Sequence, residues 1–455
     1  MLQPLARRFA AFAERFMPDA FVFALGATFV AGIAAFLVDP AARADPTLVV
    51  LARGGGFWEL AKFTLQMSMI VVGGAVLAAS PPVARAITGL AARPRTGPGA
   101  ITLVALVAML TSLLNWGFSL LVAAHLARSI AQRLRGVDYR ALAAASLLGL
   151  GTVWAQGLSG SAALQMASAS SLPAAVAKLT GAIPLTETIF RWQSGVAVVV
   201  EVAVVALVVF LAAPRNGQDA AALGISLVDE AERPLPPPTT PGERWDHSPW
   251  LLRFVVVMAA AFAVLSLRAH GGSTSESLAA IDLNLVNLTL LFTGALLHGT
   301  PSRLARAVQD ATPAVWGILL QFPFYAGISG IMTGTALSHH LADLFVGAAS
   351  ARWFPALVAA YSAVLGVFVP SGGSKWVIEA PYVLAAAARL GVPAGWVVVT
   401  YDLGEALANL VQPFWMLPVL SLLGLKARDV IGHTALVAVV LVPVVLVLVT
   451  VLAPG

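Results

Sequence analysis

The segment Val369-Pro370-Ser371-Gly372-Gly373-Ser374-Lys375 interrupts an otherwise apolar stretch between Phe354 and Leu390. Proline, two glycines and two serines in succession do not continue a regular helix. Backbone that leaves helical geometry at membrane depth exposes N–H and C=O groups that cost several kcal/mol each, so it persists only where protein or a watery cavity surrounds it. Gly/Ser runs in membrane helices more often serve helix packing. This combination instead favours a break that lines a cavity.

The composition around this segment is that of a membrane protein. Of the 455 residues, 59% are hydrophobic and 11% are charged, and the mean hydropathy is +0.87. Soluble domains carry about 25% charged residues. The net charge is +5, and the Lys and Arg residues lie in short loops between apolar segments, as the positive-inside rule predicts. The positive charge therefore does not indicate nucleic-acid binding. Without cysteine, and with seven scattered histidines, the sequence predicts no disulfide and no zinc site.

The order of apolar segments predicts an all-α polytopic membrane protein with a cytoplasmic N-terminus. We expect an interfacial amphipathic helix over 1–20, a first repeat over 21–213, a proline-rich cytoplasmic linker over 214–249, a connecting helix over 250–268 and a second repeat over 281–455. The predicted uninterrupted spans are Phe21–Val38, Phe57–Ala79, Pro184–Ala213, Leu251–Leu267, Ile281–His298, Thr312–Thr335 and Val430–Leu452.

Four longer segments contain polar interruptions. We expect re-entrant hairpins over 98–135 and 354–390, and broken transmembrane helices over 138–171 and 393–425. Asn115 precedes Gln156 by the same number of positions as Ser371 precedes Gln412. Because one connecting helix separates the halves, the second half is expected to be inverted relative to the first. Inverted repeats with discontinuous helices are typical of secondary transporters.

The four interruptions (break 1, 112–117; break 2, 156–161; break 3, 370–375; break 4, 409–413) are expected to meet near the membrane midplane. Helix N-termini there offer N–H groups to an anion, and unwound carbonyls with Ser and Asn oxygens suit a small hard cation. This favours a carboxylate transported together with Na⁺ or H⁺. Trp116, Phe118, Phe414 and Trp415 stand beside the breaks and are expected to wall an apolar sub-pocket. The predicted substrate-binding residues are Asn115, Trp116, Ser159, Ser371, Gly372, Ser374, Lys375, Gln412, Phe414 and Trp415.

Charged residues inside the apolar segments leave two interpretations open. A lysine near the bilayer centre costs about 2.5–3.5 kcal/mol and needs a partner. Lys375 either forms a structural pair with Glu379, on the same helix face, or meets the substrate carboxylate or replaces a cation. Glu405 and Asp402, with Asn409 nearby, either carry a coupled proton or assist cation binding, or they pair with a neighbouring span. Three further polar residues are interpreted as structural: Glu187, Glu201 and His125. Gln66 and Gln321 either line the same cavity or form hydrogen bonds between helices.

Several short sequence motifs resemble those of one known family. They are Leu114–Phe118, Gln321–Gly327, Val369–Gly373, Trp376–Ile378 and Gln412–Trp415. They are similar to the bacterial short-chain fatty acid transporter family, over nearly the whole chain. The resemblance implies uptake of acetoacetate or butyrate across the inner membrane by an elevator-type carrier, in a family whose elevator relatives are often homodimers.

The resemblance also implies positions for the coupling cation. Sodium-coupled relatives hold cations at the hairpin tips and broken helices, which points to Ser112, Asn115 and Gly157 for one site. The corresponding second set is Ser371, Gly373 and Gln412. The Ser-Asn-Thr tip of sodium-dicarboxylate carriers is absent here, so Na⁺ and H⁺ both remain open as the coupling ion.

We therefore predict a cation-coupled symporter for short-chain monocarboxylates, with no cofactor other than the coupling Na⁺ or H⁺. A passive channel or facilitator is one alternative, and it would keep transporting after the ion gradients collapse. An antiporter or exporter of another organic anion is the second alternative. An enzyme is not expected, because the breaks carry no nucleophile–base pair and no metal-ligand set.

Overall fold

The computed structural model describes residues 20–214, 217–227, 237–269, 274–369 and 371–454. Within these ranges the regular elements are helices and no strand occurs, which confirms the all-α class. Five of the described helical segments are long and apolar enough to cross a membrane. The expected interfacial helix over 1–20, all but its last residue, and Pro370 of break 3 lie outside the described residues.

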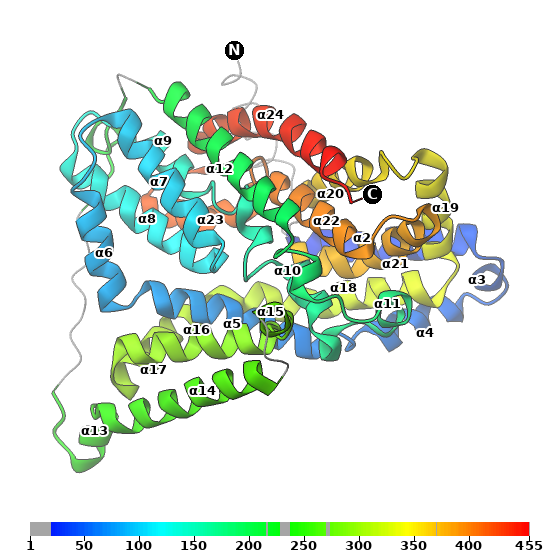
Figure 1. Ribbon diagram of the computed structural model, residues 1–455, viewed down its shortest axis with the longest axis horizontal. Coiled ribbons are helices and arrows are strands. Elements are labelled where there is room, and N and C mark those ends of the chain that lie inside the picture. Colours follow the sequence, from blue (N-terminus) through cyan, green and yellow to red (C-terminus); the bar gives the residue numbers. More distant parts are fainter. Residues whose placement is uncertain (1–19, 215–216, 228–236, 270–273, 370, 455) are drawn as a thin grey trace.

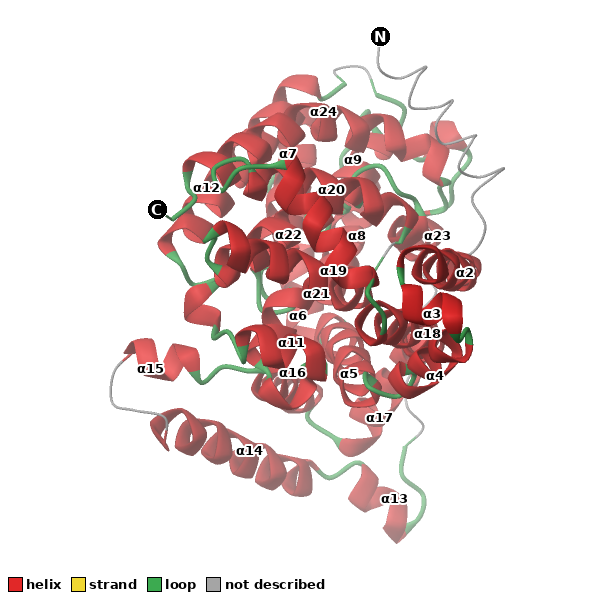
Figure 2. Ribbon diagram, turned by 90° about the vertical axis from the view of Figure 1, so that its right-hand side faces the viewer, coloured by secondary structure: helices red, strands yellow, loops and turns green. Residues whose placement is uncertain are grey.

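The described helices form two groups (Figures 1 and 2). The first group consists of α2 (Ala20–Val38), α4 (Thr47–Gly56), α5 (Ala61–Ala78), α16 (Leu283–His298), α17 (Pro301–Ala311) and α18 (Trp316–Gly334). Helix α5 packs against α16 and α17, whereas α18 packs against α2 and α4, so each half of the chain completes the other. Small residues permit this: a Cβ on Gly56 would lie 2.8 Å from Gly330 Cα.

The second group contains the two predicted hairpins and broken helices. Its long helices are α7 (Gly97–Ser112), α8 (Trp116–Arg133), α12 (Trp192–Ala212), α20 (Phe354–Phe368), α21 (Gly372–Leu390), α22 (Ala394–Ala408) and α24 (Ala427–Val451). Helices α8 and α21 connect the groups, because α8 packs against α5 and α21 against α18. The first predicted hairpin is a closely packed helix pair, α7 with α8. In the second, α20 packs mainly against α22 and α24, and α21 against α18 and α19 (Leu337–Ala348).

Helices end within or beside all four predicted breaks. Break 1 separates α7 from α8. Of break 3, only Ser371 among the described residues precedes α21; Gly372–Lys375 form the first turn of that helix, so this part of the predicted interruption is helical. The first broken helix consists of α9 (Tyr139–Ser146), the 3-10 turn η1 (Val153–Gln156) and α10 (Ser161–Ala167). The second consists of α22, the 3-10 turn η6 (Phe414–Met416) and α23 (Leu417–Leu423). Whether the halves are inverted copies stays a prediction.

Three predicted spans begin at least one helical turn before their α-helices. The span expected from Thr312 begins with the 3-10 turn η5 (Thr312–Val315) and becomes α-helical at Trp316. The span expected over Pro184–Ala213 begins with a 3-10 turn, η3 (Leu185–Glu187), and becomes α-helical only at Trp192. The span expected from Phe57 begins at Ala61, because the chain turns between α4 and α5. The latter two turns contain charged residues, Glu187 and Arg191 in one and Glu59 in the other, so the predicted spans were extended over polar positions that lie outside the α-helices.

The connecting helix, α14 (Pro249–Ala269), lies along one edge of the molecule against α16, with most of its apolar side chains exposed (Figure 1). The remaining helices are short: α3 (Pro40–Ala44), α6 (Pro81–Ala91), η2 (Ala169–Ser171), α11 (Ala174–Thr180), η4 (Ala221–Leu223), α13 (Pro241–Asp246), α15 (Thr274–Ala279) and η5 (Thr312–Val315).

Candidate functional site

Breaks 1 and 2 are joined by hydrogen bonds. The backbone N–H of Trp116 donates to Ser159 Oγ at 2.9 Å. The backbone N–H of Leu158 donates to the carbonyl oxygen of Leu113 at 2.8 Å. Gly157 permits this contact, because a Cβ there would overlap the backbone of Leu113. The tip of the first hairpin is thus fixed to the first broken helix.

Breaks 3 and 4 approach the same place from the second half. Asn409 Nδ2 donates to the carbonyl oxygen of Leu150 at 3.3 Å, and the rings of Trp116 and Trp415 meet edge-to-face at 5.1 Å. A Cβ on Gly373 would lie 3.1 Å from Ser161 Cβ, which places break 3 against break 2. The structure therefore brings together the described residues of all four breaks.

A cavity of about 700 Å³ lies where the breaks meet, between the two helix groups. The first group contributes residues of α5, α17 and α18, and the second contributes α8, α10, α21, α22 and α23. Seven of the predicted site residues line it: Trp116, Ser371, Gly372, Gly373, Glu405, Phe414 and Trp415. The other predicted site residues lie behind its wall: Ser112, Asn115, Gly157, Ser159, Ser374, Lys375 and Gln412.

Three helix or turn N-termini at the breaks are capped by side chains of the protein itself. Asn115 Oδ1 accepts from the N–H of Phe118 at 2.8 Å and caps α8. Asp402 accepts hydrogen bonds from backbone N–H groups of Ala162 and Ala163 in the first turn of α10. Gln412 Oε1 accepts from the N–H of Phe414 at 2.6 Å at the start of η6. These N-termini are therefore already occupied.

The N-terminus of α21 differs from these three. Among the described residues no side-chain hydrogen bond caps it; Ser371 occupies the N-cap position with an extended backbone, and its hydroxyl accepts from Ser374 Oγ instead. The first two residues of the helix, Gly372 and Gly373, line the cavity. A nineteen-residue helix thus directs free N–H groups and its positive dipole end towards the cavity wall.

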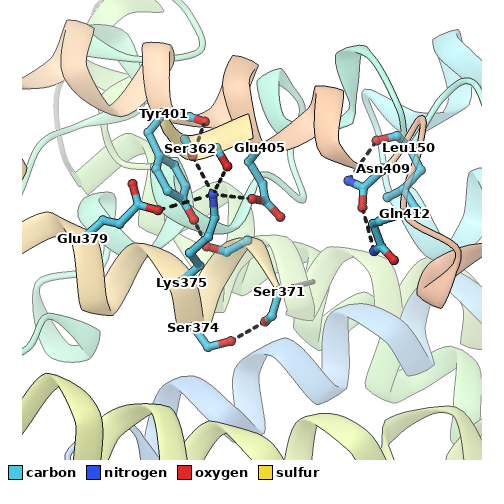
Figure 3. Close-up of polar contacts among 11 residues, drawn as sticks. Leu150, Ser362, Ser371, Ser374, Lys375, Glu379, Tyr401, Glu405, Asn409 and Gln412 are labelled. Atoms are coloured by element: carbon cyan, nitrogen blue, oxygen red, sulfur yellow. Dashed lines mark hydrogen bonds and ion pairs between the residues drawn. The ribbon is translucent and has the colours of Figure 1, made fainter. Parts of the chain in front are cut away.

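Lys375 is completely buried, and its ammonium group is held by the protein (Figure 3). Its Nζ lies 2.6 Å from Glu405 Oε2 and 3.4 Å from Glu379 Oε1. It also donates to the carbonyl oxygen of Ser362 at 2.7 Å and to its hydroxyl at 2.5 Å, and it lies 4.6 Å from the ring centre of Tyr401. Glu405 alone of the two glutamates also lines the cavity.

Several predicted cation-site atoms already have protein partners. Ser112 donates to the carbonyl oxygen of Met109 at 2.7 Å, and Asn115 Nδ2 donates to that of Ile70 at 2.9 Å. Of the two glutamines left open, Gln321 lines the cavity. Gln66 instead bonds Asn284 and Ser171, each at 2.7 Å. Where the coupling cation binds stays a prediction.

The sequence analysis did not assign several cavity residues to the site. Trp154 is the most notable of them, because it is 4% exposed and its Nε1 has no hydrogen-bond partner among the described residues. It lies in η1, just before break 2, and a tryptophan beside a Gly-rich interruption was an available signal. Met67 and Val71 lie in the uninterrupted helix α5, so nothing local marked them. Phe322 lies in the string Gln321–Gly327 that carries the family resemblance, which was an available signal.

Replacing Asn115 with alanine is expected to lower the free energy of unfolding by about 1–3 kcal/mol, because α8 loses its cap and Ile70 its hydrogen-bond donor. Thermal unfolding in detergent measures this. Asn115→Asp keeps the acceptor for Phe118 and should unfold between the wild type and the alanine variant. Identical melting temperatures for all three proteins would contradict the cap.

Comparison with known proteins gives one consistent family. A family model described as short chain fatty acid transporter matches residues 1–453. A candidate short-chain fatty acid transporter of Escherichia coli K12 is 34% identical over 438 residues, covering 95% of this chain and 96% of the relative. One of Haemophilus influenzae is 32% identical over 447 residues, covering 96% and 97%.

Two solved structures share the fold. The YdaH transporter of Alcanivorax borkumensis, described as having an unusual topology, has a TM-score of 0.57 at 14% identity, covering 96% of this chain and all of that one. MtrF of Neisseria gonorrhoeae, described with a class of antimetabolite efflux pumps, has a TM-score of 0.53 at 14% identity, covering 98% and 97%. At this identity the likeness concerns the fold alone.

Proposed function

The chain belongs to the short-chain fatty acid transporter family, and from this premise we propose that it takes up monocarboxylates such as butyrate and acetoacetate by cation-coupled symport. The family is one of transporters and not of enzymes, as the sequence indicated. The multi-pass character follows from the family and the apolar helices. The proposal places the protein in the bacterial inner membrane, with a cytoplasmic N-terminus, as a homodimer.

The observation that carries the proposal is the uncapped N-terminus of α21 at the cavity wall. A carboxylate leaving water loses strong hydration and must be hydrogen-bonded in return. The N–H groups of Gly372 and Gly373, with the Ser371 hydroxyl beside them, supply donors there. The absence of side chains on the two glycines allows a ligand to approach the backbone closely.

The rest of the cavity suits a short apolar tail. Trp116, Phe414 and Trp415 form a wall near the α21 N-terminus, and Trp154 contributes an indole N–H. Three carbons of butyrate contribute about 2.4 kcal/mol on burial, at about 0.8 kcal/mol each. Affinity is therefore expected to be modest, and uphill uptake then needs an ion gradient.

An elevator movement is the transport step that we propose. The cavity lies between two helix groups and takes residues from both. If the second group carries the four breaks as one body, its movement along the first group exposes the cavity to either side of the membrane. The hydrogen bond from Trp116 to Ser159, which joins breaks 1 and 2, and that from Asn409 of break 4 to Leu150 of the first broken helix support such a body.

Uptake of labelled butyrate and acetoacetate into proteoliposomes tests the proposal, with Na⁺ and pH gradients imposed separately. We expect protein-dependent uptake that a gradient of one of these ions drives. Uptake that persists unchanged after both gradients collapse would favour a facilitator. No uptake, with transport of an unrelated organic anion, would favour an exporter.

Trp415→Ala is expected to weaken discrimination between chain lengths. Butyrate carries two more methylene groups than acetate, worth at most about 1.6 kcal/mol, or roughly fifteenfold in affinity. The variant should reduce this ratio because one wall of the sub-pocket is removed. Competition of acetate and butyrate against labelled substrate measures it. Trp353→Ala is the matched control, since Trp353 is exposed and lies outside the cavity; an unchanged ratio in Trp415→Ala would contradict the assignment.

A further inference from the structure

The group around Lys375 contains more negative than positive charge. Glu379 and Glu405 are both buried, and both lie within ion-pair distance of the single ammonium. Among the described residues no other lysine or arginine forms an ion pair with either glutamate. Neither oxygen of Glu379 accepts a hydrogen bond there. Fully ionised, the group of Glu379, Lys375 and Glu405, here called the triad, carries a net charge of −1.

The other titratable groups facing the triad do not supply the missing positive charge. Asp402 is an acid that faces the backbone N–H groups of Ala162 and Ala163 in the first turn of α10, so it adds no positive charge. The remaining neighbours are tyrosines: Tyr401 against Lys375, and Tyr361 hydrogen-bonded to Tyr382 at 3.0 Å. One proton on a glutamate brings the triad to zero net charge.

The triad also touches the proposed substrate site. Glu405 lines the cavity, and a Cβ on Gly372 would lie 3.3 Å from Glu405 Cγ. A carboxylate bound at the N-terminus of α21 is therefore a neighbour of Glu405. Two like charges this close in a medium of low dielectric constant repel strongly, and a proton on the triad removes that repulsion.

We propose that the triad of Glu379, Lys375 and Glu405 binds the coupling proton, so that one proton and one carboxylate move together. This inference rests on the proposed function and names its coupling ion. A proton from water in the cavity adds to a glutamate oxygen when the carboxylate binds, and it returns to water when the carboxylate leaves. The loaded carrier holds a neutral triad and an anion, and the empty carrier an anionic triad. Both therefore have the same net charge, and transport is electroneutral.

The triad also favours the proton over sodium as the coupling ion. The Lys375 ammonium already has four oxygen neighbours, from Glu405, Glu379 and twice from Ser362, which is an environment that a bound cation would otherwise occupy. Because this cation is tethered to the chain, it does not exchange with the medium. The exchangeable ion is then the proton.

Two assays on the purified full chain in proteoliposomes test the proposal. Exchange of labelled for unlabelled butyrate at equal pH reports binding and movement. Net uptake driven by an acidic exterior reports coupling, and protein-free vesicles correct for diffusion of the neutral acid. For the wild type we expect both activities without Na⁺. Glu379→Gln and Glu405→Gln each leave a neutral lysine–glutamate pair, so each should lose at least tenfold in net uptake driven by the pH gradient. Glu379 does not line the cavity, so Glu379→Gln should in addition keep exchange.

Glu201→Gln is the matched control, because Glu201 is equally buried but hydrogen-bonds Gln156 away from the triad. It should retain both activities. If one glutamine variant does not fold, the other carries the comparison. The wild type supplies an independent readout, since butyrate uptake on a solid-supported membrane should produce no sustained current.

Three results would overturn the proposal: wild-type uptake driven by Na⁺ and not by the pH gradient, pH-driven uptake retained in both glutamine variants, or a sustained current. Absence of butyrate exchange in the wild type would instead contradict the proposed function itself. The two failures are therefore distinguishable.

Discussion

Replacing Lys375 with methionine is expected to lower the free energy of unfolding by about 3–5 kcal/mol, because it leaves Glu405 and Glu379 buried without a cation. Methionine has a similar length and fills much of the same space, so the loss measures charge and not volume. Ser362 loses both of its contacts with the ammonium at the same time. We expect a large fall in melting temperature and in the yield of folded protein.

The same physical argument predicts a rescue. Replacing a buried ion group by neutral residues of similar shape is often close to neutral in stability. The triple variant Lys375→Met, Glu379→Gln, Glu405→Gln should therefore recover most of the lost melting temperature. Lys62→Met is the control, since Lys62 is exposed and contacts only the Ser170 hydroxyl among the partners described. If Lys375→Met alone were as stable as the wild type, the ion pairs of Lys375 with Glu379 and Glu405 would contribute nothing to stability.

Gly157→Ala is expected to separate breaks 1 and 2. The added Cβ would overlap the carbonyl carbon, carbonyl oxygen and Cα of Leu113, and backbone atoms cannot move aside as a flexible side-chain end can. Overpacking of this kind costs about 1–3 kcal/mol. It also breaks the hydrogen bonds from Leu158 to Leu113 and from Trp116 to Ser159, which hold the cavity wall. We expect most butyrate uptake to be lost.

Gly195→Ala provides the comparison for this variant. Gly195 lies in α12, and a Cβ there meets nothing within 4 Å. Alanine is favoured over glycine in a helix by about 0.5–1 kcal/mol, so this protein should be as stable as the wild type or slightly more so, with normal uptake. Equal uptake by both alanine variants would contradict the proposed contact between the breaks.

The positions of the helix interruptions could be predicted because their causes are local. Asn115 follows the end of α7 at Ser112 and caps α8, and the glycines around Ser371 and Ser159 mark their breaks in the sequence itself. The start of α12 was predicted too early, since the span was extended over Pro184 to Arg191, a segment that contains Glu187 and Arg191 and forms turns. Hydropathy records the environment of a residue and not its backbone conformation.

The partners of the charged residues could be predicted only in part. Glu379 lies one helical turn from Lys375, so this pair was readable from spacing. Glu405 and Ser362 reach Lys375 from α22 and α20, and such contacts depend on how helices pack. Asp402 illustrates the same limit, because its role as a cap of α10 requires knowing that α10 and α22 touch.

Cysteine protection tests most directly whether a carboxylate binds where the breaks meet. The chain contains no cysteine, so each introduced thiol is the sole site of labelling. Ser371→Cys and Ser161→Cys each place a thiol at the cavity. Thr239→Cys is the control, because Thr239 is exposed and does not line the cavity. We predict that saturating butyrate slows labelling of the two cavity thiols by a small methanethiosulfonate, and leaves that of Thr239→Cys unchanged. Labelling of the cavity thiols at the same rate with and without butyrate would contradict the account.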